Sequence, residues 1–365
     1  MNASQHDVQS NRSSRHLIDR SLLCGQRPGL SAWLLRCALS CCEPIYHTGV
    51  ALRNISFDQG WRRPASVACP VISVGNLTTG GTGKTPLVHW LVRTLVDRQL
   101  SVGVISRGYR ALADGMNDEA KEFVIEFPQV MHLQNPRRIL AARELVDRHR
   151  VQAIILDDGF QHRQFARDLD VVTLDALEPW GFGHVLPRGL LRESVRGLRR
   201  ADWIVITRSN LVSAESLARV VDQASRYAGH KRIAIAEVVP RRWLAADMTA
   251  WPLESIVGRP VIAFCGLGQP TAFLETLQHL ELDIREWNAF PDHYHFNPAD
   301  IERLCERARE CGVHDLVCTV KDLVKLDRRW FDPINIWGLQ IEHRFVDGQE
   351  LLMQQIEAVT RSEDR

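Results

Sequence analysis

The chain has 365 residues and a formal net charge of +1, with 45% hydrophobic and 24% charged residues. This length predicts two or three domains, and the composition is typical of a soluble globular protein. The near-neutral charge gives no general reason to expect a nucleic-acid partner. The nine cysteines are odd in number and form no C-x-x-C pair, so reduced thiols are expected rather than a disulfide framework.

The N-terminal part is polar at first and then apolar. Residues 1–30 are rich in Ser, Arg, Gln and Asn, which predicts a disordered N-terminal extension. Residues 31–60 predict a membrane-associated helical segment, although Arg36 and Glu43 make it a poor membrane-spanning helix. Residues 1–65 carry eight Arg against four Asp or Glu, an excess that favours an anionic membrane surface. Two interpretations stay open: an interfacial helix in one leaflet, and a helix packed on the protein's own core.

The stretch from Val71 to Pro86 reads VISVGNLTTGGTGKTP and predicts a phosphate-binding loop. Its apolar start predicts a buried strand, and a helix is expected from Thr85 to about Arg93. The glycines between them let the backbone curl, so that amide N–H groups and the helix N-terminus point at an anion. Lys84 supplies a cation for the outer phosphates, and the Thr85 hydroxyl can coordinate Mg²⁺. The expected nucleotide-binding residues are Thr78, Thr79, Gly80, Gly81, Thr82, Gly83, Lys84 and Thr85.

One position departs from the generic pattern G-x-x-x-x-G-K-[ST]. Thr78 stands where that pattern has its first glycine. An ordinary glycine-rich turn before a helix is therefore the alternative interpretation. The strand before the loop and the helix after it favour the phosphate loop.

The next predicted strand, 101–105, ends in Ser106-Arg107-Gly108-Tyr109. Ligands bind beyond the carboxyl ends of parallel strands, so Arg107 is either a phosphate contact or an ordinary surface arginine. The pair Asp118-Glu119 by itself is typical of solvated charge in a loop. Residues 121–130 are strand-like, and 136–149 predict a helix.

The stretch 151–159 is the second strong signal. An apolar run predicts a strand, and Asp157-Asp158-Gly159 stand at its carboxyl end. In phosphate-loop enzymes an Asp in this place holds Mg²⁺ directly or through water. His162, further along the same loop, is expected to make a structural hydrogen bond rather than to act as a ligand or a base.

The remaining chain predicts a second domain. Arginines between 187 and 200 indicate either a solvated helix face or a site for an anionic substrate. A change in composition, with several prolines and a pair of arginines between 240 and 260, predicts a linker at 241–260. It separates a phosphate-loop core at 61–240 from a smaller lobe at 261–365. Alternating strands and helices in both parts predict parallel sheets. Strands are expected at 169–174, 203–207, 261–265, 280–287, 316–319 and 334–341, and helices at 299–311 and 351–359.

Six motifs follow one another along the chain: GNLTTGGTGKTP at 75–86, SRGY at 106–109, DDGFQH at 157–162, LPRGLLRE at 186–193, RRAD at 199–202 and FPDHYHF at 290–296. In this combination the chain resembles the tetraacyldisaccharide 4'-kinase (lipid A 4'-kinase) family, whose members phosphorylate a membrane-bound acylated disaccharide. The phosphate loop alone is not specific. Its conjunction with DDGFQH and the late DHY is highly specific, and the resemblance runs from about Trp33 to about Phe345.

The resemblance implies an α/β fold, with a P-loop NTPase-like parallel sheet core and a second, smaller α/β lobe. It implies ATP and Mg²⁺ as cofactors and transfer of the γ-phosphate to the 4'-hydroxyl of a tetraacyldisaccharide 1-phosphate. It further implies a peripheral protein on the cytoplasmic face of the inner membrane. The expected partners are the lipid substrate and the membrane leaflet, with no nucleic acid and no obligate protein partner.

The resemblance also implies roles for single residues. Asp118 matches the acid that takes the proton from the sugar hydroxyl, His293 matches the histidine that supports it from the other lobe, and Lys84 completes the catalytic set. Thr85, Asp157 and Asp158 match the surroundings of Mg²⁺. The candidate substrate contacts are Arg107, Glu119, Gln161 and Arg188. Thr78 is shared with the family, so it is no defect.

Three departures from the family pattern stand out. Asn117 replaces the glycine before Asp-Glu, and asparagine tolerates the left-handed backbone. Arg110 and Ala111 replace two glycines after SRGY, and Val320 replaces a glutamate in the late Thr-Glu-Lys-Asp pattern. None of the three removes an expected catalytic group.

Two rival functions deserve comparison with the kinase. A partition or division-site switch ATPase shares the Gly-Gly-x-Gly-Lys-Thr core, but it carries a signature lysine where this chain has Thr79. A nucleotide-gated membrane scaffold without enzymatic activity leaves Asp118 and His293 without a role.

Overall fold

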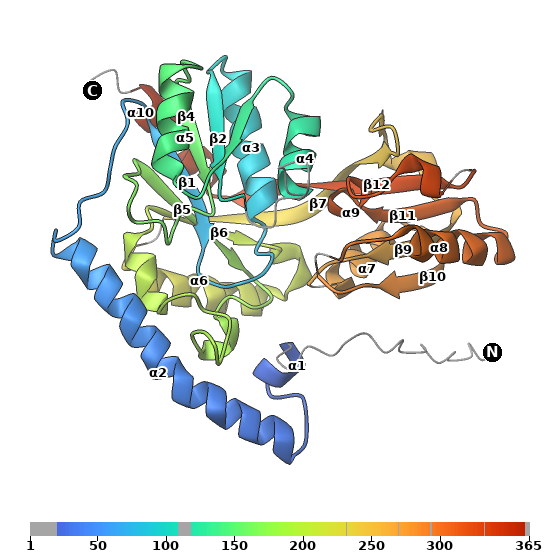
Figure 1. Ribbon diagram of the computed structural model, residues 1–365, viewed down its shortest axis with the longest axis horizontal. Coiled ribbons are helices and arrows are strands. Elements are labelled where there is room, and N and C mark those ends of the chain that lie inside the picture. Colours follow the sequence, from blue (N-terminus) through green and yellow to red (C-terminus); the bar gives the residue numbers. More distant parts are fainter. Residues whose placement is uncertain are drawn as a thin grey trace.

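The computed structural model describes residues 20–108, 118–230, 232–268, 270–292, 294–331 and 333–361. Its strands form one twelve-stranded sheet in the order β10-β9-β11-β12-β7-β6-β5-β1-β4-β2-β3, with β8 paired to β7. Figure 1 shows a larger body and a smaller lobe, with β7 and β12 running from one to the other.

The strands are β1 Val71–Asn76, β2 Val102–Ser106, β3 Met131–Gln134, β4 Ala153–Asp157, β5 Leu169–Asp175, β6 Trp203–Thr207, β7 Ile233–Ala245, β8 Ala250–Trp251, β9 Pro260–Cys265, β10 Asp283–Ala289, β11 Asp315–Thr319 and β12 Asn335–Asp347. The α-helices are α1 Arg20–Leu23, α2 Leu30–Asp58, α3 Lys84–Asp97, α4 Asp118–Glu126, α5 Arg138–Asp147, α6 Ala214–Ala228, α7 Pro270–His279, α8 Pro298–Glu310, α9 Val320–Leu323 and α10 Gln349–Arg361. After residue 150, each predicted strand and each of the helices predicted at 299–311 and 351–359 is present.

The larger body is built on the parallel strands β6-β5-β1-β4-β2-β3. β1 is buried along its whole length and pairs with β4 on one side and β5 on the other. Such strands read as continuous apolar runs because helices cover both faces of the sheet. Leu87 and Leu91 of α3 pack against Ile72 and Val74 of β1 in one buried cluster. This packing fixes the direction in which the chain leaves β1.

The smaller lobe has its own apolar core. Strands β10, β9, β11 and β12 are parallel, as expected for this part of the chain. Phe264 of β9 contacts Phe290 and Phe296 edge to face, and the same cluster includes Ile301 and Leu304 of α8. Edge-to-face packing adds a preferred geometry to the burial of these rings.

The junction between the two parts differs from the expectation. β7 and β12 pair antiparallel over most of their length, from Trp337 opposite Ala245 to Asp347 opposite Ile235. An antiparallel pair needs no crossover helix between its strands, so alternation of elements did not reveal it. Residues 241–260 contain the end of β7, β8 and a short 3-10 helix, instead of an extended connection. The assignment of the domains 1–30, 31–60, 61–240 and 261–365 stays a prediction.

The prediction of a strand-like segment at 121–130 is wrong. The segment from Asp118 to Glu126 is α4, and the loop position predicted for Asp118 and Glu119 is the first turn of that helix. Ala120, Phe123 and Phe127 are buried while Val124 is exposed, which is helical spacing. The short sequence Phe-Val-Ile resembles a strand, but burial of one helix face decides the structure.

Candidate active site

The phosphate loop lies where β1 ends, between the carboxyl ends of β4 and β5. Gly80 (φ 110°) and Gly83 (φ 79°) have positive φ angles, which glycine adopts without strain. α3 begins directly after Gly83, so its unpaired N–H groups and the positive end of its dipole face the loop. The geometry is that of an anion-binding helix N-terminus.

Two side chains from other strands donate hydrogen bonds to carbonyl groups of the phosphate loop. Oγ1 of Thr207 donates to the carbonyl of Thr82 at 2.9 Å, and Nε2 of His343 donates to the carbonyl of Gly83 at 2.8 Å. A Cβ atom on Gly83 would lie 3.2 Å from atoms of both side chains, so the site tolerates little more than glycine. His343 comes from β12, and sequence reasoning missed it.

Thr78, where the generic pattern has a glycine, is a buried part of the loop. Its backbone forms an antiparallel bridge with Leu191, and its carbonyl accepts a hydrogen bond from Nδ2 of Asn76 at 2.6 Å. Its φ angle is not among the positive ones. A side chain therefore fits at this position.

Lys84 is the first residue of α3, and its Nζ lies 3.4 Å from Oδ1 of Asp158. Nη1 of Arg192 donates to the two carboxylate oxygens of Asp158 at 2.7 and 2.9 Å. Burial raises the pKa of Asp158, but the charges of Lys84 and Arg192 outweigh it and lower the pKa to about 2. Asp158 is thus an anion that holds two cations beside the phosphate loop.

Asp157 ends β4, and its environment is the opposite of that of Asp158. Its Oδ1 is buried without a hydrogen-bond partner in the described part of the chain. Burial, together with the charge of Glu119, raises the pKa of Asp157 to about 7. The two neighbouring carboxyls therefore differ: Asp158 is paired with two cations, whereas burial outweighs the charges of Lys84 and Arg138 at Asp157 and keeps its pKa raised.

The donors present suit a hard cation. Carboxylate and hydroxyl oxygens, here Asp157 and Thr85, are the ligands that Mg²⁺ takes while it keeps waters and phosphate oxygens. The unpaired oxygen of Asp157 is an acceptor that such an ion would satisfy, with release of its proton. Among the described residues, no group of three or more His, Cys, Asp or Glu side chains could enclose a metal ion. A site completed by phosphate is the arrangement that fits.

Lys325 of the smaller lobe forms an ion pair with Asp118 of the larger body, and sequence reasoning also missed this residue. Its Nζ lies 3.4 Å from Oδ2 of Asp118 and 3.0 Å from Oδ1 of Asp322, and it donates to the carbonyl of Tyr294 at 3.3 Å. The Lys325 side chain is 5% exposed. Asp118, the expected catalytic acid, is thus tied to the other lobe through an ion pair.

Some predicted site residues lie outside the described residues. These are His293 and the segment 109–117, which contains Tyr109, Arg110, Ala111 and Asn117. The described neighbours of His293 in the chain are Asp292 and Tyr294. Asp292 lies 3.9 Å from Nζ of Lys321, and Tyr294 contacts Lys325 as described above.

The candidate substrate contacts are distributed over the site. Glu119, on the first turn of α4, is close enough to Asp157 to affect its pKa, and Arg107 lies exposed after β2. Nε2 of Gln161 donates to the carbonyl of Asn76 at 2.8 Å. Arg188 points elsewhere, because its Nη1 donates to the carbonyl of Leu23 after α1 at 2.8 Å. The structure therefore brings Glu119 and Gln161 near the two acids at the end of β4.

Residues 187–200, read as a possible helix face, begin with turns and bends, and Val195–Arg200 form a short 3-10 helix. Within this segment Glu193 is almost completely buried and accepts from Nε2 of Gln161 at 3.1 Å and from Arg200 at 2.8 Å. The motif LPRGLLRE included Arg192 and Glu193, but nothing in it indicated that Arg192 pairs with Asp158 or that Glu193 is buried against Gln161.

α2 is a single long helix that lies outside the sheet of the larger body (Figure 1). Tyr46 donates to the carbonyl of Arg192 at 3.0 Å, and Nδ2 of Asn54 donates to Glu193 at 3.0 Å. The large apolar side chains that α2 leaves exposed are Leu30, Trp33, Leu34, Ile45, Leu52 and Ile55. Within the described residues, no helix combines the length and the apolarity that crossing a bilayer requires.

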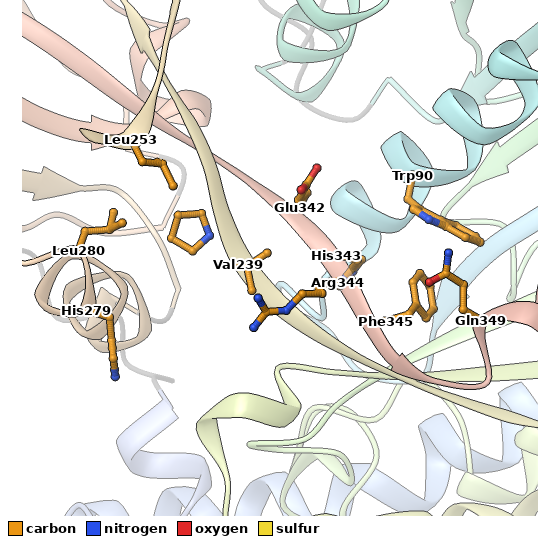
Figure 2. A pocket seen from close by; sticks show the side chains of 11 residues that line it. Trp90, Val239, Leu253, His279, Leu280, Glu342, His343, Arg344, Phe345 and Gln349 are labelled. Carbon is orange, nitrogen blue, oxygen red and sulfur yellow. The ribbon is translucent and has the colours of Figure 1, made fainter. Parts of the chain in front are cut away.

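His343 also lines a hollow of about 610 Å³. Figure 2 shows the side chains that surround it. Trp90, Glu342, Arg344 and Phe345 are among its lining residues. Arg344 is paired with Glu237, at 2.6 Å. The His343 side chain thus contacts Gly83 of the phosphate loop and also lines the hollow.

Fold and site together define a class of protein. A strand, a loop with left-handed glycines, a lysine at the start of a helix and acids after the neighbouring strand are the features of P-loop α/β proteins that bind nucleotides.

Comparisons with known proteins narrow the class to one family. The model of the tetraacyldisaccharide-1-P 4'-kinase family matches residues 35–361. A tetraacyldisaccharide 4'-kinase of Halothermothrix orenii is 35% identical over 340 residues, which cover 83% of this chain and 88% of that protein. One from Anaeromyxobacter sp. (strain Fw109-5) is 35% identical over 355 residues, covering 92% and 94%. The crystal structure of LpxK from Aquifex aeolicus, described as an "apo" form in complex with ATP, matches with a TM-score of 0.72 and 27% identity, covering 89% of this chain and 99% of that one.

The chain belongs to the tetraacyldisaccharide-1-P 4'-kinase family, whose members are kinases of lipid A biosynthesis. The resemblance stated from the motifs and the predicted fold class are confirmed. These relatives give no support to the switch ATPase.

Proposed function

We propose that the protein transfers the γ-phosphate of ATP to the 4'-hydroxyl of a tetraacyldisaccharide 1-phosphate. The observation that carries the proposal is that Lys84 of the phosphate loop and Glu119 at the start of α4 both lie close enough to Asp157 to affect its pKa. The names of the relatives supply the acceptor, and the ATP complex of the Aquifex aeolicus protein supplies the donor.

In this proposal the phosphate loop binds ATP, and Lys84 neutralises charge on the outer phosphates. Thr85 and the acids Asp157 and Asp158 would hold Mg²⁺, with Asp157 favoured because its Oδ1 has no other described partner. Bound Mg²⁺ would supply positive charge to the β- and γ-phosphate oxygens. Most of the rate of phosphoryl transfer comes from such positioning and charge stabilisation.

Asp118 accepts the proton of the sugar hydroxyl, and His293 orients it from the smaller lobe. The support for this pairing is indirect: Lys325 contacts both Asp118 and the carbonyl of Tyr294, which follows His293 in the chain. Because the groups come from two lobes, their approach would assemble the site and exclude water.

A direct test uses γ-labelled ATP with a tetraacyldisaccharide 1-phosphate in detergent micelles, with separation of lipid and aqueous products. We expect the label in the lipid. The same sugar phosphate without acyl chains serves as the control and should accept poorly. Release of the label only as inorganic phosphate contradicts the kinase and favours a switch ATPase.

We further propose that the protein acts as a peripheral protein on the cytoplasmic face of the inner membrane, bound through α2. Its exposed apolar side chains include Trp33 (54%) and Ile45 (76%), and the same helix contacts the residues around Glu193. An interfacial helix with an apolar face inserts into the headgroup region, where an acylated acceptor also lies.

Replacing Trp33 and Ile45 together by glutamate is expected to weaken binding to vesicles that contain anionic phospholipid by at least tenfold. Full burial of each apolar side chain contributes about 2 kcal/mol, and a charge cannot replace it. Vesicle flotation measures the bound fraction. Leu140→Glu, at a side chain of α5 that is 46% exposed, is the control and should bind normally. Equal weakening by both changes, or no binding by the unaltered protein, contradicts the anchor.

A further inference from the structure

One carboxylate joins four elements of the fold. Glu126 is the last residue of α4, and its side chain is 4% exposed. Its oxygens accept from Nδ1 of His89 at 2.7 Å, Nη2 of Arg93 at 2.5 Å, Nη1 of Arg241 at 2.6 Å and Nε2 of Gln340 at 2.7 Å. These donors come from α3, β7 and β12. The carboxylate therefore connects α4 with α3, β7 and β12.

The charges around Glu126 make these contacts strong. Burial by itself raises the pKa of Glu126, but hydrogen bonds and charges from His89 and Arg93 lower it to about 2. Hydrogen bonds to a charged group are roughly twice as strong as neutral ones. Glu342 of β12 also lies 3.3 Å from Arg93 and from Arg241. Glu126 is the member of this cluster that belongs to α4.

Glu126 links the two helices that carry Lys84 and Asp118. α3 begins at Lys84 and α4 begins at Asp118, and the Glu126 carboxylate connects the body of α3 with the far end of α4. α4 has nine residues, so Asp118 lies about 12 Å along the helix from Glu126. A tilt of about 10° at Glu126 would move Asp118 by roughly 2 Å at that helix length.

We propose that Glu126 is a positioning residue, which fixes the distance from Asp118 to a phosphate group held at Lys84. The inference rests on the function proposed above. Glu126 acts through Asp118 and touches no reactant. A displacement of about 1 Å can cost 10²-fold in rate, so the anchor of α4 has a kinetic consequence. Arg241 and Gln340 belong to the β7–β12 pair, so the same contacts hold α4 against the strands that lead to the smaller lobe.

The first test is Glu126→Gln, which keeps the shape of the side chain and removes its charge. We expect kcat for phosphoryl transfer to fall roughly 10- to 100-fold. The KM for ATP should stay within about twofold, because the residues of the phosphate loop are unchanged. Glu342→Gln is the matched control, since it faces the same two arginines, is 35% exposed and lies on β12. It should keep kcat within about threefold.

A double-mutant comparison separates positioning from general damage. In an Asp118→Asn background, Glu126→Gln should lower the residual rate by less than about threefold, because the group that it positions is already gone. An equal loss in both backgrounds overturns the inference, as does a KM for ATP that rises in step with the loss of kcat.

A milder variant covers the case in which Glu126→Gln does not fold. Gln340→Met removes one donor of the four at similar volume, and we expect a three- to tenfold lower kcat with an unchanged KM for ATP. A normal kcat for this variant contradicts the inference. Absence of transfer by the unaltered protein would instead reject the proposed function, so the two failures are distinguishable.

Discussion

Replacing Lys84 by alanine is expected to lower kcat for phosphoryl transfer by 10³-fold or more. The Lys84 ammonium lies at the N-terminus of α3, beside the phosphate loop, and is 16% exposed. A single fixed donor or cation facing developing charge contributes from about 10² in rate to about 10⁵ for the strongest cases. The rate of label transfer from ATP to the lipid acceptor measures the loss.

The matched control is a cation with no role in the site. Arg226 of α6 forms an exposed ion pair with Asp222, and Arg226→Ala should leave both kcat and the KM for ATP unchanged. Loss of folding is checked by thermal unfolding of the Lys84 variant. Near-normal transfer at saturating ATP would mean that Lys84 does not stabilise the transferred group.

Replacing Asp118 by asparagine is expected to lower kcat by about 10²- to 10⁴-fold, the range of general-base catalysis. The KM for ATP should change little, because Asp118 is on α4 and not on the phosphate loop. Folding should survive, since Lys325 keeps its ion pair with Asp322 at 3.0 Å. Steady-state kinetics with ATP and the lipid acceptor varied separately resolves kcat from the two KM values.

Asp222→Asn, at an exposed carboxylate of α6, is the control for this change and should behave as the unaltered protein. The assigned role is wrong if the Asp118 variant binds ATP poorly yet turns over normally once saturated. In that case Asp118 would contribute to the nucleotide site rather than to removal of the proton.

The phosphate loop was predictable because its parts are contiguous. A strand, two left-handed glycines and a lysine at a helix start lie within the stretch 71–86, and each follows from local backbone chemistry. Asp157 and Asp158 were predictable as a pair for a similar reason, since acids after a buried apolar run mark the carboxyl end of a strand. Their separate environments were not predictable, because Arg192 pairs with Asp158 and does so from another loop.

α4 shows where local pattern fails. The sequence Phe123-Val124-Ile125 is β-branched and aromatic enough to resemble a strand, and propensity gave no contrary signal. Burial of Phe123 and Phe127 on one face and the ion pairs of Glu126 at the end stabilise a helix instead. Tertiary contacts are worth more than propensity in a segment of nine residues.

By itself the sequence determined the fold class, the phosphate loop and the family, because these depend on short patterns and their order along the chain. Only the tertiary structure decided which distant groups meet: Lys325 with Asp118, His343 with Gly83, and Glu126 with Gln340, 214 residues further on. An ion pair or hydrogen bond between residues far apart in the chain produces no periodic pattern in the sequence. Such contacts exist only after the antiparallel β7 and β12 have brought the two parts of the chain together.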